Sequence, residues 1–161
     1  MNCPAKTEGI LTHLHSFQEI IYKQYDEKCA LRLLKKANHI FIELYTNGVK
    51  HTQGAFFEMG IRCQSDVLEI QKLDDGPPPP FAMQIFSKQT IPYIATVYNT
   101  VTATYSSTNT LLFGISESKT MEEEFAFEHY GLQIITLAAT QFSYTWLPQA
   151  KLNKFYCSVN V

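Results

Sequence analysis

Apolar side chains recur at helical spacing in the first third of the chain. One stripe, with members three or four residues apart, predicts an amphipathic helix over residues 10–25. A second stripe, at spacings of four, three and four, predicts a longer helix over residues 28–51, and Gly54 suits its end. The two stripes consist of Ile10, Leu14, Phe17, Ile21 and Tyr25, and of Leu33, Ala37, Ile40 and Leu44.

Alternation between apolar and polar residues replaces the helical spacing after residue 55. The odd-numbered residues from Phe57 to Cys63 are apolar and the residues between them are polar or glycine, which predicts a half-buried strand. Residues 67–73 predict a second strand. It must end at Asp74-Asp75-Gly76, because the four prolines that follow cannot donate hydrogen bonds to a sheet.

The rest of the chain predicts more strands and one clear helix. Residues 91–105 are rich in Thr, Val and Tyr and favour extended chain. The remaining expectations are a loop at 106–109, a short strand at 111–115, an acidic helix at 119–128, a helix at 131–140 and strands at 142–147 and 155–161. We expect one α+β domain over residues 1–161, with 81–130 as a variable region. Helices should cover one face of a mixed, mostly antiparallel sheet in a two-layer sandwich.

Composition and charge narrow the function classes. Apolar residues make up 45% and charged residues 17% of the chain, which is ordinary for a globular domain. The net charge of −2 gives no basic field of the kind that binds nucleic acid. The four cysteines are scattered without a C-x-x-C pair, and no apolar run reaches membrane-span length. We therefore expect a cytoplasmic protein with free thiols and without a membrane or nucleic-acid partner.

One face of the second helix carries candidate chemistry. Glu43, Asn47 and Lys50 fall at i, i+4 and i+7, beside the apolar stripe, so that the three side chains share a half-buried face. Carboxylate and amide oxygens suit Mg²⁺, and an ammonium suits phosphate oxygens. Taken alone, such a face is more often simply solvated.

Two further elements are weaker when each stands alone. Asp74 lies at a strand end, where its carboxylate can accept a hydrogen bond from an exocyclic amine such as that of adenine, although Asp-Gly is also a common turn pair. Gly131 lies at the predicted start of a helix, where backbone N–H groups can approach phosphate.

The order and spacing of these elements resemble the GHKL superfamily of ATP-binding domains, which have the Bergerat fold. Residues 43–51, Glu-Leu-Tyr-Thr-Asn-Gly-Val-Lys-His, resemble its N-box, roughly E-L-x-x-N-A-x-K-H. Asp74-x-Gly76 is similar to the start of its G1 box, D-x-G-x-G. Residues 129–134 are similar to a reduced G2 box, G-x-G-L-G-L. The resemblance covers about residues 30–161.

Carried over by position, the resemblance implies roles for the helix face. Asn47 would ligate Mg²⁺, and Glu43 would ligate it through water or act as the general base toward an incoming hydroxyl. Lys50 and His51 would face the phosphates of ATP. The implied cofactors are therefore ATP and Mg²⁺.

The glycine boxes imply roles for three more residues and also show departures. Asp74 would accept from the adenine amine, Gly76 would leave room for the base, and Gly131 would mark the helix start under the phosphates. Pro78 replaces the second glycine of the G1 box, while His129 and Gln133 replace two glycines of the G2 box. Because a glycine loop lets backbone amides approach phosphate, these changes should weaken triphosphate capture.

Within the superfamily, the chain lacks a phospho-acceptor H-E-x-x-x-P motif after His13 and His15. It is similar in size to anti-sigma-factor serine kinases and to SiaB-like bacterial kinases of partner-switching systems. The resemblance implies an ATP-dependent serine/threonine kinase acting on a small antagonist protein. Two alternatives stay open: a pseudo-kinase that serves as an interaction module, and a stand-alone histidine-kinase catalytic domain with a response regulator as partner. A homodimer is compatible with each.

Overall fold

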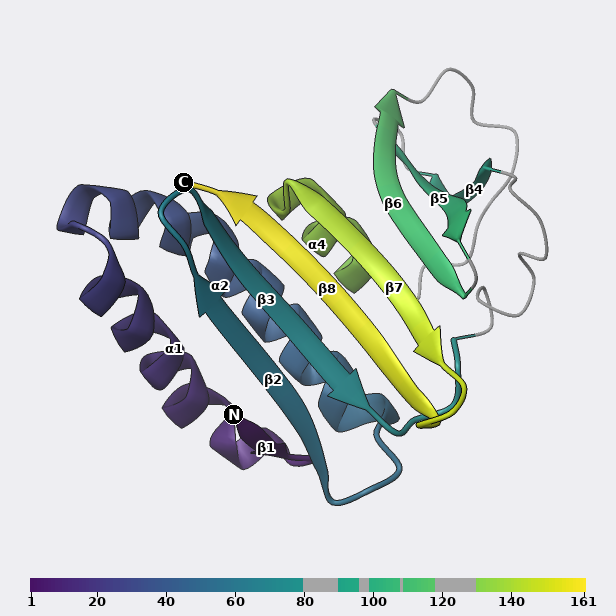
Figure 1. Ribbon diagram of the computed structural model, residues 1–161, viewed down its shortest axis with the longest axis horizontal. Coiled ribbons are helices and arrows are strands. Elements are labelled where there is room, and N and C mark those ends of the chain that lie inside the picture. Colours follow the sequence, from purple (N-terminus) through teal and green to yellow (C-terminus); the bar gives the residue numbers. More distant parts are fainter. Residues whose placement is uncertain (80–89, 96–98, 108, 118–129) are drawn as a thin grey trace.

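The strands form one sheet, and the helices cover one of its faces (Figure 1). The computed structural model describes residues 1–79, 90–95, 99–107, 109–117 and 130–161. The helical elements are the short 3₁₀ helix η1 (Thr7–Gly9), α1 (Ile10–Gln24), α2 (Glu27–His51) and α4 (Tyr130–Ala138). The strands are β1 (Asn2–Pro4), β2 (Phe56–Cys63), β3 (Val67–Asp74), β4 (Thr90–Ala95), β5 (Asn99–Ser107), β6 (Thr110–Glu117), β7 (Gln141–Leu147) and β8 (Leu152–Asn160).

The order of strands across the sheet places the last strand in its middle. The order is β1-β2-β3-β8-β7-β6-β5-β4, and every pairing among the described strands is antiparallel. The expected α+β class and the two-layer arrangement with helices on one face are confirmed. Because β8 lies between β3 and β7, the end of β3 meets the start of β8, and Asp74 stands opposite Asn153.

The two N-terminal helices follow the predicted stripes. Phe17 and Ile21 of α1 are buried, as are Leu33, Ala37, Ile40 and Leu44 of α2. Between the helices, Asp26 is the N-cap of α2, and its carboxylate accepts a hydrogen bond from the Cys29 N–H at 3.0 Å. This bond satisfies one of the backbone donors that a helix leaves free at its start.

Replacing this cap should have a measurable effect. We expect Asp26→Ala to lower the free energy of unfolding by about 1 kcal/mol, because one N–H at the start of α2 loses its acceptor. Asp26→Asn keeps a side-chain acceptor and should change stability far less. Urea unfolding of the two variants measures the difference, and equal losses would contradict the capping role.

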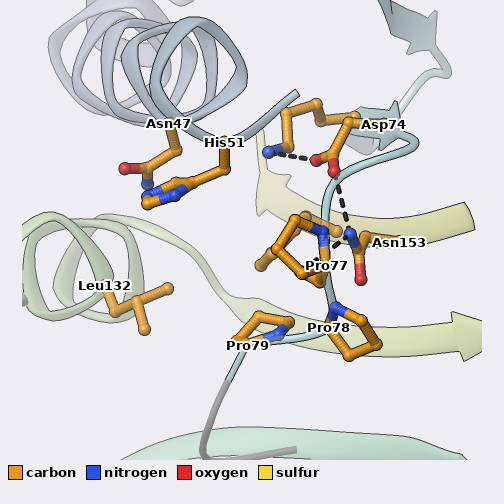
Figure 2. Close-up of a pocket in the computed structure, with 10 residues that line it drawn as sticks. Asn47, His51, Asp74, Pro77, Pro78, Pro79, Leu132 and Asn153 are labelled. Carbon is orange, nitrogen blue, oxygen red and sulfur yellow. Dashed lines mark hydrogen bonds and ion pairs between the residues drawn. The ribbon is translucent and has the colours of Figure 1, made fainter. Parts of the chain in front are cut away.

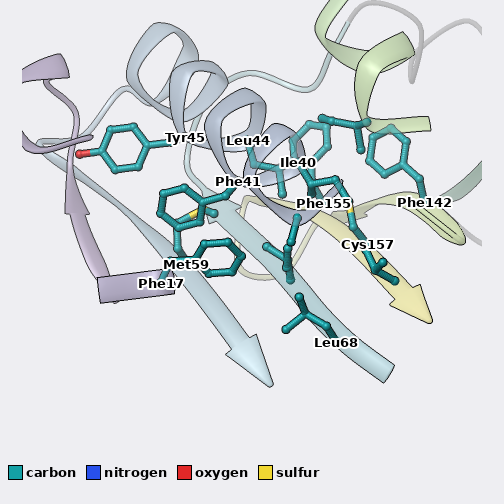
Figure 3. Close-up of a cluster of buried hydrophobic side chains, with 14 of the residues drawn as sticks. Phe17, Ile40, Phe41, Leu44, Tyr45, Met59, Leu68, Phe142, Phe155 and Cys157 are labelled. Carbon is teal, nitrogen blue, oxygen red and sulfur yellow. The ribbon is translucent and has the colours of Figure 1, made fainter. Parts of the chain in front are cut away.

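The core lies between the helices α1, α2 and α4 and the sheet (Figure 3). Aromatic rings fill much of it. Phe17 stacks on Phe41 with ring centroids 4.6 Å apart, and Tyr45 meets Phe57 edge-on at 5.1 Å. Such ring pairs stabilise beyond the area that they bury. The packing holds α2 firmly on the sheet, and so fixes where its last turns lie.

The structure differs from the sequence-based expectation at β1 and between residues 91 and 107, where β5 also includes two residues of the expected loop at 106–109. β1 was not expected; it pairs with β2 at the edge of the sheet. The extended segment 91–105 is two paired strands, β4 and β5, which with β6 continue the sheet beyond β7. The expected helix at 119–128 lies outside the described residues.

Candidate functional site

The last turns of α2 and the end of β3 meet at a pocket (Figure 2). Its volume is about 150 Å³. An enclosed cavity of that volume holds about one aromatic ring, and because this pocket is partly open, a larger group can extend out of it. The pocket is lined by Asn47, His51, Lys72, Asp74, Pro77, Pro78, Pro79, Leu132, Asn153 and Phe155. It therefore brings Asn47 of the predicted helix face, together with His51, close to the predicted strand-end carboxylate of Asp74.

The helix-face residues reach different surroundings. Asn47 and His51 are one turn apart and lie on the α2 side of the pocket, across from Asp74 and Asn153 (Figure 2). Asn47 is half-buried, as the sequence predicted. Lys50 is exposed and does not line the pocket. Glu43 is half-buried and also lies outside the lining, one turn before Asn47.

Glu43 lies instead against the start of α4. A Cβ added at Gly131 would come within 2.5 Å of Glu43 Oε2 and 3.6 Å of Asn47 Nδ2. The absence of a side chain at Gly131 thus lets α4 approach the face of α2 that carries both residues. A carboxylate at the N-terminal end of a helix is favourable electrostatically. The G2-box residue His129 lies outside the described part of the chain.

Asp74 is held by contacts from two strands and a loop. It is 3% exposed. Its Oδ1 accepts hydrogen bonds from the Gly76 N–H at 3.0 Å and from Asn153 Nδ2 at 2.8 Å. Its Oδ2 lies 2.5 Å from the ammonium of Lys72, and Figure 2 draws this ion pair as a dashed line. The carboxylate therefore keeps one fixed orientation at the inner end of the pocket.

Lys72 is a site residue that the sequence reasoning missed. Its side chain is 1% exposed, and its ammonium lies 4.4 Å from the centroid of the Phe155 ring. Burial lowers the pKa of Lys72, and the charge of Asp74 opposes this shift. The alternation along β3 carries the signal, because the inward positions Leu68 and Ile70 are followed by Lys72 and then Asp74.

Asn153, also missed, connects the pocket to the core. Its Nδ2 donates to Asp74 Oδ1 and to the Gly76 carbonyl oxygen, both at 2.8 Å. Its Oδ1 accepts from the Tyr144 hydroxyl at 2.8 Å. Burial raises the pKa of Tyr144, and the Asp74 charge raises it further, so that this hydroxyl stays a donor. Asn153 is thus a fully bonded support for Asp74.

Gly76 has a contact that the sequence did not predict. A Cβ added there would overlap the His51 carbonyl oxygen and lie 3.0 Å from Asp74 Oδ1. The end of β3 therefore runs directly against the last turn of α2. Asp75 strengthens the junction, because its Oδ1 accepts from the N–H groups of Gln53 and Gly54, each at 3.0 Å.

The remaining walls of the pocket are apolar. Leu132 and Phe155 line it together with Pro77, Pro78 and Pro79. Proline has no N–H group, so that these three residues give no backbone donors to a phosphate. Their rings suit the flat face of an apolar or aromatic group. The pocket thus joins apolar walls to a polar inner end.

A metal ion would find an incomplete set of ligands here. Among the described residues, no cluster of three or more His, Cys, Asp or Glu side chains is placed to hold one. Glu43 and Asn47 supply one carboxylate and one amide. That set suits Mg²⁺, which usually keeps several waters and binds substrate phosphates.

Comparisons with protein-family models, with curated proteins and with solved structures found no match for this chain. Within the described residues, every helix is too short or too polar to cross a membrane.

Proposed function

We propose that the chain is an ATP-binding regulatory protein of the GHKL type, acting as a serine/threonine kinase in partner-switching signalling. The observation that carries the proposal is the pocket shared by Asn47, His51 and Asp74. Those residues come from two sequence motifs that are more than twenty positions apart. The resemblance assigns them to metal, phosphate and adenine of one nucleotide.

The walls and the inner end of the pocket have the chemistry that a nucleobase requires. A purine has two apolar faces and a polar edge, and the pocket has proline and aromatic walls around the Asp74 carboxylate. Asn47 lies across the pocket from the Asp74 carboxylate (Figure 2), so that a nucleotide whose base meets Asp74 would direct its phosphates toward Asn47 under the proposal. Bound Mg²⁺ would compensate the phosphate charge. We further propose a cytoplasmic location, in agreement with four free cysteines.

The proposed reaction transfers the γ-phosphoryl group of ATP to a hydroxyl of a small antagonist protein. The hydroxyl oxygen forms the new bond to phosphorus, the bond to the β-phosphate oxygen breaks, and ADP leaves. Glu43 would accept the hydroxyl proton. For this its carboxylate, which lies beside Gly131, must face the acceptor when the nucleotide is bound.

Nucleotide binding should raise the melting temperature. At about 100 times its dissociation constant, ADP with Mg²⁺ adds about 2.7 kcal/mol, which for a chain of this size is a shift of several degrees. We expect Asn47→Ala to abolish the shift, because it removes an amide that lines the pocket. The matched control is Asn38→Ala, which removes an amide of the same helix that bonds Gln18 instead. An unchanged melting-temperature shift for Asn47→Ala would contradict the proposal.

A second candidate is a pseudo-kinase that binds partners without turnover. The position of Glu43 against Gly131 and the three prolines in the pocket wall favour it. The two candidates differ in one measurement. Transfer of labelled γ-phosphate to a serine or threonine of an antagonist protein would exclude the pseudo-kinase. Binding of ATP without any phosphate transfer to the antagonist protein would favour the pseudo-kinase.

A further inference from the structure

The inner end of the pocket presents a hydrogen-bond acceptor directly beside a donor. Asp74 Oδ2 and Lys72 Nζ are 2.5 Å apart, and both side chains are 1% exposed while lining the pocket. They occupy inward positions two residues apart on β3. Groups buried this deeply have little access to water. A bound ligand is therefore the expected partner for any hydrogen-bonding site that the protein leaves unused.

The acceptor capacity of Asp74 can be counted. An ionised carboxylate has about four lone-pair sites, two on each oxygen. On Oδ1 both are used, by the Gly76 N–H and by Asn153 Nδ2. Oδ2 has the Lys72 ammonium beside it and no conventional hydrogen bond from the described residues. Asp74 therefore has room for one further donor, and only on Oδ2.

The donor capacity is on Lys72. Its ammonium has three N–H groups, of which one points to Asp74 in the ion pair. The aromatic ring of Phe155 lies on another side. Asn153 cannot take the place of Lys72, because both of its N–H bonds are directed at Asp74 and the Gly76 carbonyl oxygen.

We propose that Lys72 is a specificity-determining residue that donates to N1 of an adenine base while Asp74 Oδ2 accepts from the neighbouring amino group. This inference rests on the proposed nucleotide-binding function. Adenine presents one amino donor next to one ring-nitrogen acceptor along its pairing edge. Guanine presents the reverse order at the same two positions, with the O6 acceptor where adenine has its amino group and an N1–H donor where adenine has N1. In the same pose, O6 would face the Asp74 carboxylate and N1–H would face the Lys72 ammonium. The protein then selects adenine over guanine because the Lys72 ammonium and the Asp74 carboxylate bind the base together.

The test compares three nucleotides on the wild-type protein. Calorimetry with ADP, 1-deaza-ADP and 3-deaza-ADP isolates N1, because the first analogue replaces that nitrogen with C–H and the second alters the opposite edge. We expect 1-deaza-ADP to bind about tenfold more weakly than ADP or worse, which corresponds to loss of a hydrogen bond to a charged group. 3-Deaza-ADP should bind within a few-fold of ADP, and GDP much more weakly.

The Lys72→Met variant completes the design. In a folded variant, verified by circular dichroism, ADP and 1-deaza-ADP should bind equally, because no donor remains for N1 to lose. The wild-type comparison decides the question even if this variant does not fold. Equal affinity of the wild type for ADP and 1-deaza-ADP, or for ADP and GDP, overturns the role of Lys72 alone. Failure of every nucleotide to bind overturns the proposed function with it.

Discussion

Replacing Lys72 by methionine is expected to lower the free energy of unfolding by about 3–5 kcal/mol. The reason is the carboxylate left behind. Asp74 is 3% exposed, and its Oδ2 lies beside the Lys72 ammonium without a conventional hydrogen bond from the rest of the described chain. Methionine is similar in length and fills the space over Phe155, so that the loss reports charge rather than a cavity. Urea unfolding at constant m-value gives the difference.

A double variant separates charge from packing. In Lys72→Met/Asp74→Asn no buried charge remains, and the asparagine Oδ1 can still accept from Gly76 and Asn153. We expect the double variant to be more stable than Lys72→Met alone. A double variant as unstable as Lys72→Met would show that the packing of the lysine stem, and not the ion pair, stabilises this end of the sheet.

The helices and most strands could be predicted because their signals are local. The stripes of α1 and α2 follow from spacing, and the alternation in β2 and β3 marks their inner faces. The division of 91–105 into two strands could not be seen, because a run rich in Thr and Val is compatible with strand throughout. β1 has three residues, too few for a periodic pattern.

The site was only partly predictable, for a different reason. Asn47, His51 and Asp74 belong to recognisable motifs and do meet at one pocket. The alternation along β3 places Lys72 at an inward position, but it does not show which group the buried ammonium would pair with. Its burial depends on Asp74, and the orientation of Asp74 depends on Asn153, which lies 79 residues further along the chain. Such dependence on strand order is absent from any local pattern.

Gly76→Ala is expected to lower the free energy of unfolding by about 3 kcal/mol or more. The added methyl group would overlap the His51 carbonyl oxygen, which is helix backbone and cannot rotate away like a side chain. Either α2 or the end of β3 must shift, and the shift would also move His51 away from Asp74. The melting-temperature shift with ADP should therefore be lost in this variant, even at temperatures where it is folded.

Gly114→Ala is the matched control for Gly76→Ala. Gly114 lies in β6, where an added Cβ would meet Thr102 Oγ1 at 3.5 Å, an ordinary contact. A glycine inside a strand costs conformational entropy on folding, so that alanine should be neutral or slightly stabilising there. Urea unfolding of both variants measures the contrast. Equal stability of Gly76→Ala and Gly114→Ala would contradict the close approach of the β3 end to the α2 backbone, and with it the pocket between them.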